Sequence, residues 1–377
     1  MSIINLHIYL SNFTSETRIF KETNSISKFK LADKIIMIGV VTDNLPEFQK
    51  LDEVREIHRI RLFMSRFKKN KVIDVFKFIE FSIIVLLKYK KLKPTFVNLH
   101  SYAVLPLSFF FKNKQNKVIY DTHELETEKA RLGPRLKVIS KKIERYLIRY
   151  VDIIIVVSDS IGVWYRNAYQ KPIFLIRNIP NASSIINNRD NVLRDFLNIS
   201  DSDILFIYQG LISIDRGINV LLEAFKGLPT NKHIVFMGFG ESVEEVKKIS
   251  KSYKNIHFHG AVPYKEISRY TSGADVGLSL LQNTCLNHYY CLPNKLFEYI
   301  LAGIPVIVSD FPDMKKIVLS NNLGWVTNPN VSSIIELINE ITIEEVKRTK
   351  KNVQQNRTKY NWEQEEQIFP QIFNLQT

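Results

Sequence analysis

The chain has 377 residues, of which 45% are hydrophobic and 24% are charged, as in a soluble globular protein. This length allows two domains that each bury their own core. The longest apolar run, residues 81–87, is too short to cross a bilayer, and the first residues lack the pattern of a signal peptide. Two cysteines, Cys285 and Cys291, argue against a disulfide framework and against a structural zinc site. We therefore expect a protein of the reducing cytosol.

The net charge of +14 is concentrated in one half of the chain. Residues 1–180 hold 32 basic and 17 acidic residues, a net charge of +15, whereas residues 181–377 hold 20 and 21, a net charge of −1. Such asymmetry is typical of a surface that meets a polyanion, either nucleic acid or an anionic membrane. None of the standard nucleic-acid-binding motifs is present, so we expect an anionic membrane surface as the partner and no nucleic acid.

Strands and helices are expected to alternate along the chain, which is typical of parallel sheets covered by helices. In the first half, strands are expected over residues 4–10, 35–41, 95–99, 118–120 and 153–157, and helices over 15–27, 71–90 and 134–149. In the second half, strands are expected over 204–208, 233–237, 256–259, 276–280 and 306–308, and helices over 218–226, 243–250, 264–271, 293–302, 314–319, 343–360 and 362–374. Periodicity breaks at residues 176–184, which predicts one domain over 1–178 and another over 179–361.

Histidines follow two of the strands that are expected in the first half. His100 directly follows one strand, and His123 directly follows the next one. Ligands of open α/β sheets bind at the carboxyl ends of the strands, so these residues are candidates for a binding site. The alternative is structural, because a single histidine is more often a hydrogen-bonding residue than a catalyst.

A strongly basic amphipathic helix is predicted over residues 134–149. Its apolar residues recur at steps of three and four, and its basic residues occupy the other faces. The apolar set is Leu132, Leu136, Ile139, Ile143 and Leu147, and the basic set is Arg131, Arg135, Lys137, Lys141, Lys142, Arg145 and Arg149. We favour packing of the apolar stripe on the sheet, although a helix of this type can also lie on anionic lipid. Basic clusters at residues 66–71 and 88–93 add to the same positive potential.

The segment from Pro293 to Asp310 is the most informative part of the sequence. It predicts a short helix that begins after a proline, ends at Gly303, and is followed by a buried strand. Lys295 and Glu298 are three residues apart, so they share one side of this helix near its N-terminus. The free N–H groups and the helix dipole favour an anion there. A nucleotide fits this pattern, with Lys295 near its diphosphate and Glu298 on its ribose hydroxyls.

This segment resembles the donor-binding motif of the retaining family 4 glycosyltransferases. That motif has two glutamates, and Glu298 with Gly303 matches its second half, whereas Tyr290 stands at the position of the first glutamate. A subset of the family carries the same Pro-Asn-Lys-Leu-Phe-Glu-Tyr sequence. The resemblance implies the α/β GT-B fold, with two Rossmann-like domains facing each other across a cleft. It also implies that a C-terminal helix over about 362–377 crosses back onto the first domain.

The resemblance extends to the loops that follow the other strands of the second half. The family has a basic residue at the position of Arg216 that holds the donor diphosphate, and the alternative is a solvated arginine at a helix start. A second basic residue of many relatives is replaced by Leu211, and we expect Lys295 to supply the missing charge. Gly238 and Gly240 form a weak dinucleotide fingerprint and more simply a tight turn.

The residues expected to act are assigned by this resemblance in three groups. The catalytic group is His100, Arg216, Lys295 and Glu298. The donor-binding group is Gly210, Arg216, Gly238, Gly240, Val262, Tyr290, Leu292, Pro293, Asn294, Lys295 and Glu298. The acceptor-side group is Thr17, Arg18, His100 and His123. No cluster of histidine and carboxylate residues has metal-ligand spacing in the sequence, so we expect neither a metal nor another cofactor.

The expected activity is transfer of a hexose-type sugar from a nucleotide sugar to a hydroxyl group, with retention of anomeric configuration. By family association, the acceptor is a glycan or a lipid-linked glycan of bacterial surface polysaccharide synthesis. The expected location is the cytoplasm, peripherally on the inner face of the cytoplasmic membrane. Two alternatives share the fold: a noncatalytic donor-binding subunit, suggested by Tyr290, and a nucleotide-sugar epimerase, which would need a further carboxylate near Tyr290.

Overall fold

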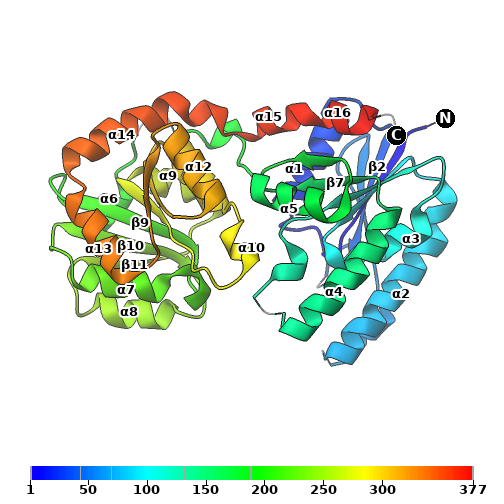
Figure 1. Ribbon diagram of the computed structural model, residues 1–377, viewed down its shortest axis with the longest axis horizontal. Coiled ribbons are helices and arrows are strands. Elements are labelled where there is room, and N and C mark those ends of the chain that lie inside the picture. Colours follow the sequence, from blue (N-terminus) through cyan, green and yellow to red (C-terminus); the bar gives the residue numbers. More distant parts are fainter. Residues whose placement is uncertain (1, 43, 69, 131, 187–188, 376–377) are drawn as a thin grey trace. The chain divides into compact units, whose positions relative to one another are not determined.

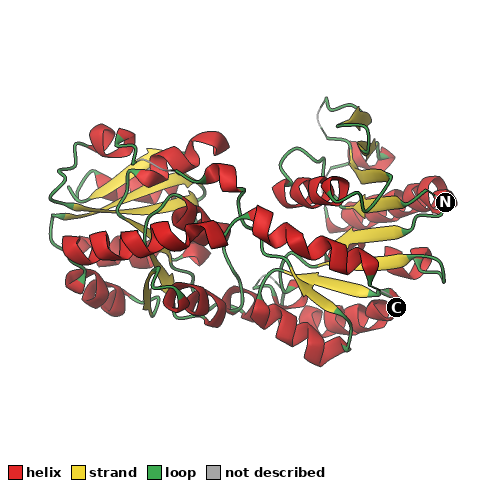
Figure 2. Ribbon diagram, turned by 90° about the horizontal axis from the view of Figure 1, so that it is seen from above, coloured by secondary structure: helices red, strands yellow, loops and turns green. Residues whose placement is uncertain are grey.

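The computed structural model describes residues 2–42, 44–68, 70–130, 132–186 and 189–375. The chain forms two compact units. Unit 1 comprises Met1–Arg177 and Glu366–Thr377, and unit 2 comprises Asn178–Glu365. In each unit, helices cover both faces of a mainly parallel sheet (Figures 1 and 2). The change from unit 1 to unit 2 falls inside the stretch where the periodicity of the sequence breaks.

The sheet of unit 1 has the strand order β3-β4-β2-β1-β5-β6-β7-β8, and all neighbours are parallel except β3 and β4. Its strands are β1 (Ile4–Ile8), β2 (Lys34–Val40), β3 (Phe48–Lys50), β4 (Arg55–Ile60), β5 (Phe96–His100), β6 (Lys117–Asp121), β7 (Ile153–Val156) and β8 (Ile173–Leu175). The central strands are buried on both faces, which explains their nearly continuous apolar sequences. β3, β4 and β8 were not expected from the sequence, because they are short or carry charged residues near the sheet edges.

The helices of unit 1 follow the strands in the usual alternation. They are α1 (Thr17–Lys28), α2 (Lys71–Tyr89), α3 (Leu107–Phe111), α4 (Pro134–Leu147), α5 (Asp159–Tyr169) and α16 (Phe369–Asn374). α5 was not expected, although Ser158 caps it by accepting a hydrogen bond from the backbone N–H of Ile161. None of the helices in the described part of the chain combines the length and the apolar character that a membrane span requires.

The packing of α4 differs from the arrangement that the sequence favoured. Its buried residues are Glu144 and Leu147, whereas Leu136, Ile139 and Ile143 are all exposed. Apart from Leu147 at its end, the middle of the apolar stripe is therefore not packed on the sheet, and the expectation that the stripe would pack there was wrong. Periodicity identifies an apolar face but not what covers it. Arg131 of the basic set, and Lys69 of the neighbouring basic cluster, lie outside the described residues.

The sheet of unit 2 is parallel throughout, with the order β11-β10-β9-β12-β13-β14. Its strands are β9 (Ile204–Leu211), β10 (Lys232–Phe239), β11 (Ile256–Gly260), β12 (Val276–Ser279), β13 (Val306–Ser309) and β14 (Gly324–Thr327). Alternate residues of β9 point to opposite faces: Leu205 and Ile207 join one apolar cluster, and Phe206 and Tyr208 join the other. β14, at the sheet edge, was not expected.

The helices of unit 2 cover both faces of this sheet (Figure 2). They are α6 (Val192–Leu197), α7 (Ile218–Lys226), α8 (Val243–Ser250), α9 (Ile267–Ser272), α10 (Leu286–Tyr289), α11 (Asn294–Leu301), α12 (Pro312–Ser320), α13 (Val331–Glu340), α14 (Ile343–Asn356) and α15 (Trp362–Glu365). α11 and α12 pack on the face of Leu205 and Ile207, and α7 and α13 pack on the opposite face.

The last residues of the chain pack on unit 1. Glu366 accepts a hydrogen bond of 2.6 Å from the hydroxyl of Ser25 and pairs with Lys28, both on α1. Farther on, the ring of Phe373 on α16 lies 4.5 Å from that of Phe96 on β5, centre to centre. Residues 366–375 thus belong to the unit formed by the first half of the sequence.

Candidate functional site

The start of α11 lies at the surface of unit 2. Asn294 is exposed, and Pro293, Lys295 and Glu298 are half-buried, whereas the apolar face of the helix is packed in the core. Pro293 is the residue before the first turn rather than its first residue, so the helix begins one position later than expected. No side chain caps this end. The first amide groups of α11 therefore stay available to an anion.

Two basic side chains lie close together beside this helix start. The nitrogen of Lys295 lies 3.6 Å from the centre of the Tyr208 ring, which is a cation–π contact with a residue of β9. Burial of Lys295 and the nearby guanidinium of Arg216 lower the pKa of Lys295 to about 7, against the opposing effect of Glu298. Because Arg216 and Lys295 repel each other, an anion placed between them would relieve this repulsion.

The backbone around Gly217 fixes the position of Arg216. Arg216 ends the short 3-10 helix Ile214–Arg216, and Gly217 turns the chain into α7 with a φ of +76°. A Cβ on Gly217 would lie 2.7 Å from the carbonyl oxygen of Leu280, which follows β12. Glycine is thus required by both conformation and space. The loop after β9 is held against the end of β12, and Arg216 is held with it.

Glu298 is held by a hydrogen-bond chain that the sequence did not reveal. Its carboxylate accepts a bond of 2.6 Å from the side-chain amide of Gln209, and the amide oxygen of Gln209 accepts a bond of 2.6 Å from the hydroxyl of Thr271. The backbone N–H of Gln209 donates to the hydroxyl of Tyr299, at 3.0 Å. Gln209 is buried directly before Gly210, a position in the loop motif that could have drawn attention to it.

The predicted glycines bring two strand ends close together. Gly238 on β10 is paired in register with Gly210 on β9, and a Cβ on Gly238 would lie 1.9 Å from the Gly210 carbonyl oxygen. Gly240 is restricted in the same way by the carbonyl oxygen of Ile212, at 2.2 Å. A close approach of neighbouring backbones is therefore the structural reason for Gly238 and Gly240. Gly210 itself is exposed near the end of β9.

The other residues predicted to bind the donor lie on or near the core beneath α11. Val262 and Leu292 are half-buried and pack against the apolar cluster that contains Leu296 of α11. Tyr290 is half-buried after α10, and its ring centre lies 5.4 Å from that of Tyr289. The structure thus places these three residues in unit 2, where Arg216, Lys295 and Glu298 lie.

The strand order of the sheet also points to the carboxyl ends of β9 and β12 as a binding site. β9, β10 and β11 follow one another toward one edge of the sheet, whereas β12, β13 and β14 run toward the other edge, so the order reverses between β9 and β12. In open α/β sheets, ligands bind at the carboxyl ends of the strands beside such a reversal. Gly210, Arg216 and Gly217 lie at this point, with the contact between Gly217 and Leu280 joining the two strand ends.

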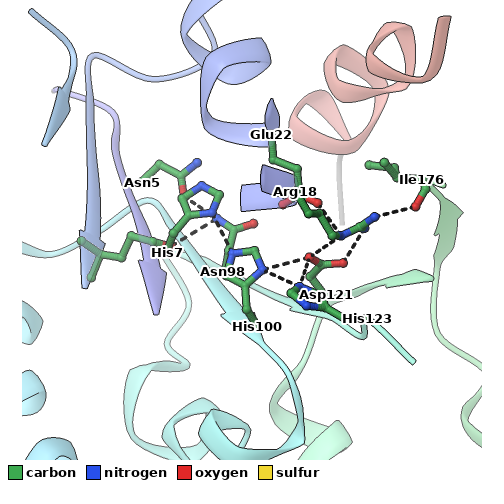
Figure 3. A network of polar contacts seen from close by, with 10 residues as sticks. Asn5, His7, Arg18, Glu22, Asn98, His100, Asp121, His123 and Ile176 are labelled. Atoms are coloured by element: carbon green, nitrogen blue, oxygen red, sulfur yellow. Dashed lines mark hydrogen bonds and ion pairs between the residues drawn. The ribbon is translucent and has the colours of Figure 1, made fainter. Parts of the chain in front are cut away.

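In unit 1, the predicted residues Arg18, His100 and His123 converge on Asp121 at the end of β6 (Figure 3). Asp121 accepts bonds from Arg18 (2.7 and 3.1 Å), from His100 Nδ1 (2.9 Å) and from His123 Nε2 (3.0 Å). Arg18 also pairs with Glu22 at 2.9 Å. Burial alone would raise the pKa of Asp121, but Arg18 and the two histidines hold it well below its usual range.

His100 is fully buried, and both of its ring nitrogens are engaged. Burial lowers the pKa of His100 to about 4, so the ring is neutral at neutral pH. With Asp121 ionised, Nδ1 of His100 donates to Asp121, and Nε2 accepts from Nδ1 of His7, at 2.9 Å. His7 was not singled out in the sequence. It lies inside β1, where a buried polar residue is hidden among apolar ones.

The acceptor-side residues therefore fall into two classes. Arg18 and His100 are buried, at 4% and 0% exposure, whereas Thr17 is exposed and His123 is half-buried. Only the second pair presents its side chains at the surface in the described structure. Arg18 and His100 can position their neighbours, because the network they form links β1, β5, β6 and α1.

The fold also brings together groups with the geometry of metal ligands. The donor atoms of His100, Asp121 and His123 lie within 4.8 Å of one another, and so do those of His7, Glu22 and His100. The absence of ligand spacing in the sequence was therefore misleading, because these residues come from separate strands and helices. Asp121 is already paired with Arg18, and the histidines bond to Asp121 and to each other. A self-contained polar network accounts for these contacts, so the expectation of no metal stays a prediction.

Comparison with known proteins gives this geometry a family context. Residues 190–360 match the model of the family described as glycosyl transferases group 1. A lipopolysaccharide 1,2-N-acetylglucosaminetransferase of Salmonella typhimurium is 23% identical over 348 residues, which cover 86% of this chain and 85% of that protein. Residues 190–360, which match the family model, contain Arg216, Lys295, Glu298 and all of the other residues predicted to bind the donor.

Solved structures with the same fold cover nearly the whole chain. Sucrose-phosphate synthase from Thermosynechococcus elongatus aligns with a TM-score of 0.77 and 14% identity, over 98% of both chains. HepE from Anabaena, solved in complex with UDP and glucose, aligns with a TM-score of 0.72 and 13% identity, over 98% of this chain and 99% of that one. The chain has the GT-B fold of these structures, and the match to the group 1 glycosyltransferase family covers residues 190–360, within unit 2.

Proposed function

We propose that this chain is a retaining glycosyltransferase that moves a hexose-type sugar from a nucleotide-sugar donor to a hydroxyl group. The observation that carries the proposal is that Lys295, in the first turn of α11 at its uncapped N-terminus, feels the positive charge of Arg216, while Glu298 is held one turn further on by Gln209. A diphosphate needs two cations and free amide groups, and a ribose needs a fixed carboxylate.

Each of these groups has a separate part in the proposed reaction. As the bond between the sugar and the diphosphate breaks, negative charge grows on the leaving nucleoside diphosphate. Arg216 and Lys295 stabilise that charge, because they are already positioned and need no reorganisation. Glu298 accepts hydrogen bonds from the ribose hydroxyls and thereby orients the nucleotide. Since two cations are supplied by side chains, we propose that the reaction does not depend on a metal.

The proposed acceptor is a glycan or a lipid-linked glycan of a bacterial surface polysaccharide. The relative from Salmonella, whose name gives lipopolysaccharide as its substrate, supports this class of acceptor. Binding of UDP and glucose by HepE supports a nucleotide-sugar donor. We propose that the enzyme works in the cytoplasm at the inner face of the cytoplasmic membrane, where acceptors carried on lipid are presented.

Tyr290 supports one rival function. It stands where related enzymes have a glutamate that contacts the transferred sugar, so a chain that binds the donor without turning it over is the second candidate. The epimerase has less support, because the half-buried region around Tyr290, Leu292 and Pro293 offers no further carboxylate in the sequence.

The test is incubation of the purified protein with a panel of nucleotide sugars and a membrane extract as acceptor. Release of nucleoside diphosphate that requires the acceptor supports the transferase. An isomerised nucleotide sugar without diphosphate release identifies an epimerase. Tight donor binding with no turnover in any extract identifies the noncatalytic subunit. Analysis of the product anomer by nuclear magnetic resonance decides between retention and inversion.

A further inference from the structure

Unit 1 exposes an unusual number of large apolar side chains in one part of its sequence. Among the described residues, 26 large hydrophobic side chains are exposed, and 16 of them lie between Phe63 and Tyr146. Scattered exposed apolar residues are ordinary on a protein surface, but a concentration of this kind marks an interaction site. We call the α2, α3 and α4 members of this group, with Phe63 and Phe67, the apolar face.

α2 contributes most of the apolar face. Its exposed residues recur at steps of one to four and form one stripe along the helix: Val72, Val75, Phe76, Ile79, Ile83 and Leu87, at 45–72% exposure. A different stripe, with Phe81, Val85 and Tyr89, is buried in unit 1. The helix is thus apolar on two sides, and only one side is used by the fold. A solvent-facing stripe of this length has no role in folding unit 1.

α2 and α4 are connected through α3. Phe63 lies beside the middle of α2, where Glu80 accepts hydrogen bonds from the backbone N–H groups of Phe63 and Met64, and the ring of Phe67 lies 5.7 Å from that of Phe63. α2 also packs against α3, whose Phe109 and Phe110 are exposed. The ring of Phe109 lies 4.9 Å from that of Tyr150, and Tyr150 lies 5.9 Å from Tyr146 on α4. α3 therefore lies next to α2 and is linked to α4 through Tyr150.

Unpaired cations accompany this face. Eight exposed basic residues on or next to α2 and α4 form no ion pair within the described part of the chain. They are Lys71, Lys88, Lys90, Lys91, Lys93, Arg135, Lys142 and Arg145. The acidic residues of these helices are engaged elsewhere: Asp74 pairs with Lys77 at 4.0 Å, Glu80 caps the segment at Phe63, and Glu144 is buried.

We propose that the apolar face docks on an anionic lipid bilayer, with the α2 stripe entering the acyl boundary and the flanking lysines on the headgroups. Anionic headgroups would neutralise the unpaired cations, and the boundary would remove the apolar side chains from water. A second copy of the chain fits less well, because it would bring the same cations face to face. The proposal does not depend on the reaction that the chain catalyses.

The test measures binding to vesicles. The wild-type chain should sediment with vesicles of phosphatidylethanolamine and phosphatidylglycerol at least about tenfold better than with phosphatidylcholine alone, and about 0.5 M salt should weaken this binding. The triple variant Phe76→Asp/Ile79→Asp/Ile83→Asp should lose at least about tenfold of the binding. Replacing Lys88, Lys90 and Lys91 by glutamine should reduce the preference for anionic vesicles.

A matched pair of single variants separates docking from general surface effects. Ile79 on α2 and Val163 on α5 are 45% and 48% exposed, so Ile79→Asp and Val163→Asp change equally accessible residues of one unit. Only Ile79→Asp should weaken vesicle binding. The proposal is overturned if the wild type does not bind anionic vesicles or if both single variants lose binding equally. It is also overturned if the triple variant abolishes a concentration-dependent dimer and leaves vesicle binding unchanged.

Diphosphate release with a detergent-solubilised acceptor should be unchanged in the triple variant, so failure of docking is distinguishable from failure of the proposed reaction.

Discussion

Lys295 lies over the ring of Tyr208, with its nitrogen 3.6 Å from the ring centre. Tyr208 is itself fixed, because its hydroxyl donates to the carbonyl oxygen of Leu211 at 2.7 Å. A helix residue is thereby attached to the end of β9, at the loop that carries Arg216. We expect Lys295 to supply the charge that is absent at Leu211, and its contact with the Tyr208 ring stabilises it when no anion is bound.

Removing either cation should lower turnover without unfolding the chain. We expect Arg216→Ala and Lys295→Ala each to reduce diphosphate release by more than about tenfold, because each removes a charge that stabilises the leaving group. Steady-state rates with a saturating acceptor measure the effect. Lys254→Ala, at an exposed position of the same unit, is the control and should leave the rate unchanged. Unchanged rates in both site variants would remove the diphosphate assignment.

Binding of the nucleoside diphosphate should take up a proton at alkaline pH. The pKa of Lys295, lowered to about 7 by burial and by Arg216, leaves most of its amines neutral at about pH 8. A bound diphosphate favours the ammonium form and raises this pKa, so binding at about pH 8 should take up close to one proton and binding at about pH 6 almost none.

Calorimetry in two buffers with different heats of ionisation measures this uptake. Lys295→Arg is the control, because its guanidinium stays charged at both pH values and the uptake should disappear. An uptake that survives in Lys295→Arg would assign the proton to a different group. Proton release at about pH 8 would contradict the expected sign.

The hydrogen bond from Gln209 to Glu298 should affect recognition of the ribose. We expect Gln209→Leu to weaken nucleoside diphosphate binding by about tenfold, because it removes a 2.6 Å bond to a carboxylate. The same change should weaken binding of the 2′,3′-dideoxy analogue much less, since that ligand offers Glu298 no hydroxyl groups. Thr271→Val removes only the hydrogen bond from Thr271 to Gln209, so it should have a smaller effect. Equal losses for both ligands would mean that Gln209 has a structural role alone.

The sequence predicted some parts of this molecule well for identifiable physical reasons. α7 and α8 have the expected bounds, since an apolar stripe at helical spacing defines each of them. β7 is buried on both faces of the sheet, and its sequence is accordingly an unbroken apolar run that could be recognised. Short edge strands such as β3 produce no comparable signal. Proline and glycine defined the limits of α11 to within one residue.

The site could be predicted only where its residues are near one another in sequence. Lys295 and Glu298 share a helix, so their proximity follows from their spacing. Gln209 reaches Glu298 across 89 positions, and His7 reaches His100 across 93, so only the folded chain reveals these contacts. The exposure of the α4 stripe could not be predicted either, because periodicity does not say whether a face is covered.

Breaking the buried network around Asp121 should destabilise unit 1 strongly. Asp121→Asn leaves the guanidinium of Arg18 with Glu22 as its remaining carboxyl partner in a buried site, and we expect a loss of about 3–5 kcal/mol in the free energy of unfolding. Urea unfolding measures the loss. Glu53→Gln breaks the exposed pair with Lys50 and should cost less than about 1 kcal/mol. A small effect of Asp121→Asn would show that the network is not needed for stability.

Glu144 should make the stability of unit 1 depend on pH in an unusual direction. Its buried carboxyl attaches α4 to the core by accepting hydrogen bonds from Tyr165 (2.9 Å) and Tyr169 (2.6 Å). Burial raises the pKa of Glu144 to about 6, above the value of 4.5 that it has when exposed. The folded chain therefore holds this proton more tightly than the unfolded chain, so the contribution of Glu144 to stability falls as the pH rises from about 4.5 to about 6.

The variant Glu144→Gln isolates this effect, because an amide does not titrate. The free energy of unfolding of the wild type, minus that of the variant, should fall by about 2 kcal/mol between about pH 4 and about pH 8. Urea titrations of both chains at several pH values give this difference, and all other titrating groups cancel in it. A difference that stays constant with pH would mean that the carboxyl ionises as easily in the folded chain as in water. The outcome matters for the apolar face as well, since α4 is held on unit 1 by this polar cluster and by little buried apolar area.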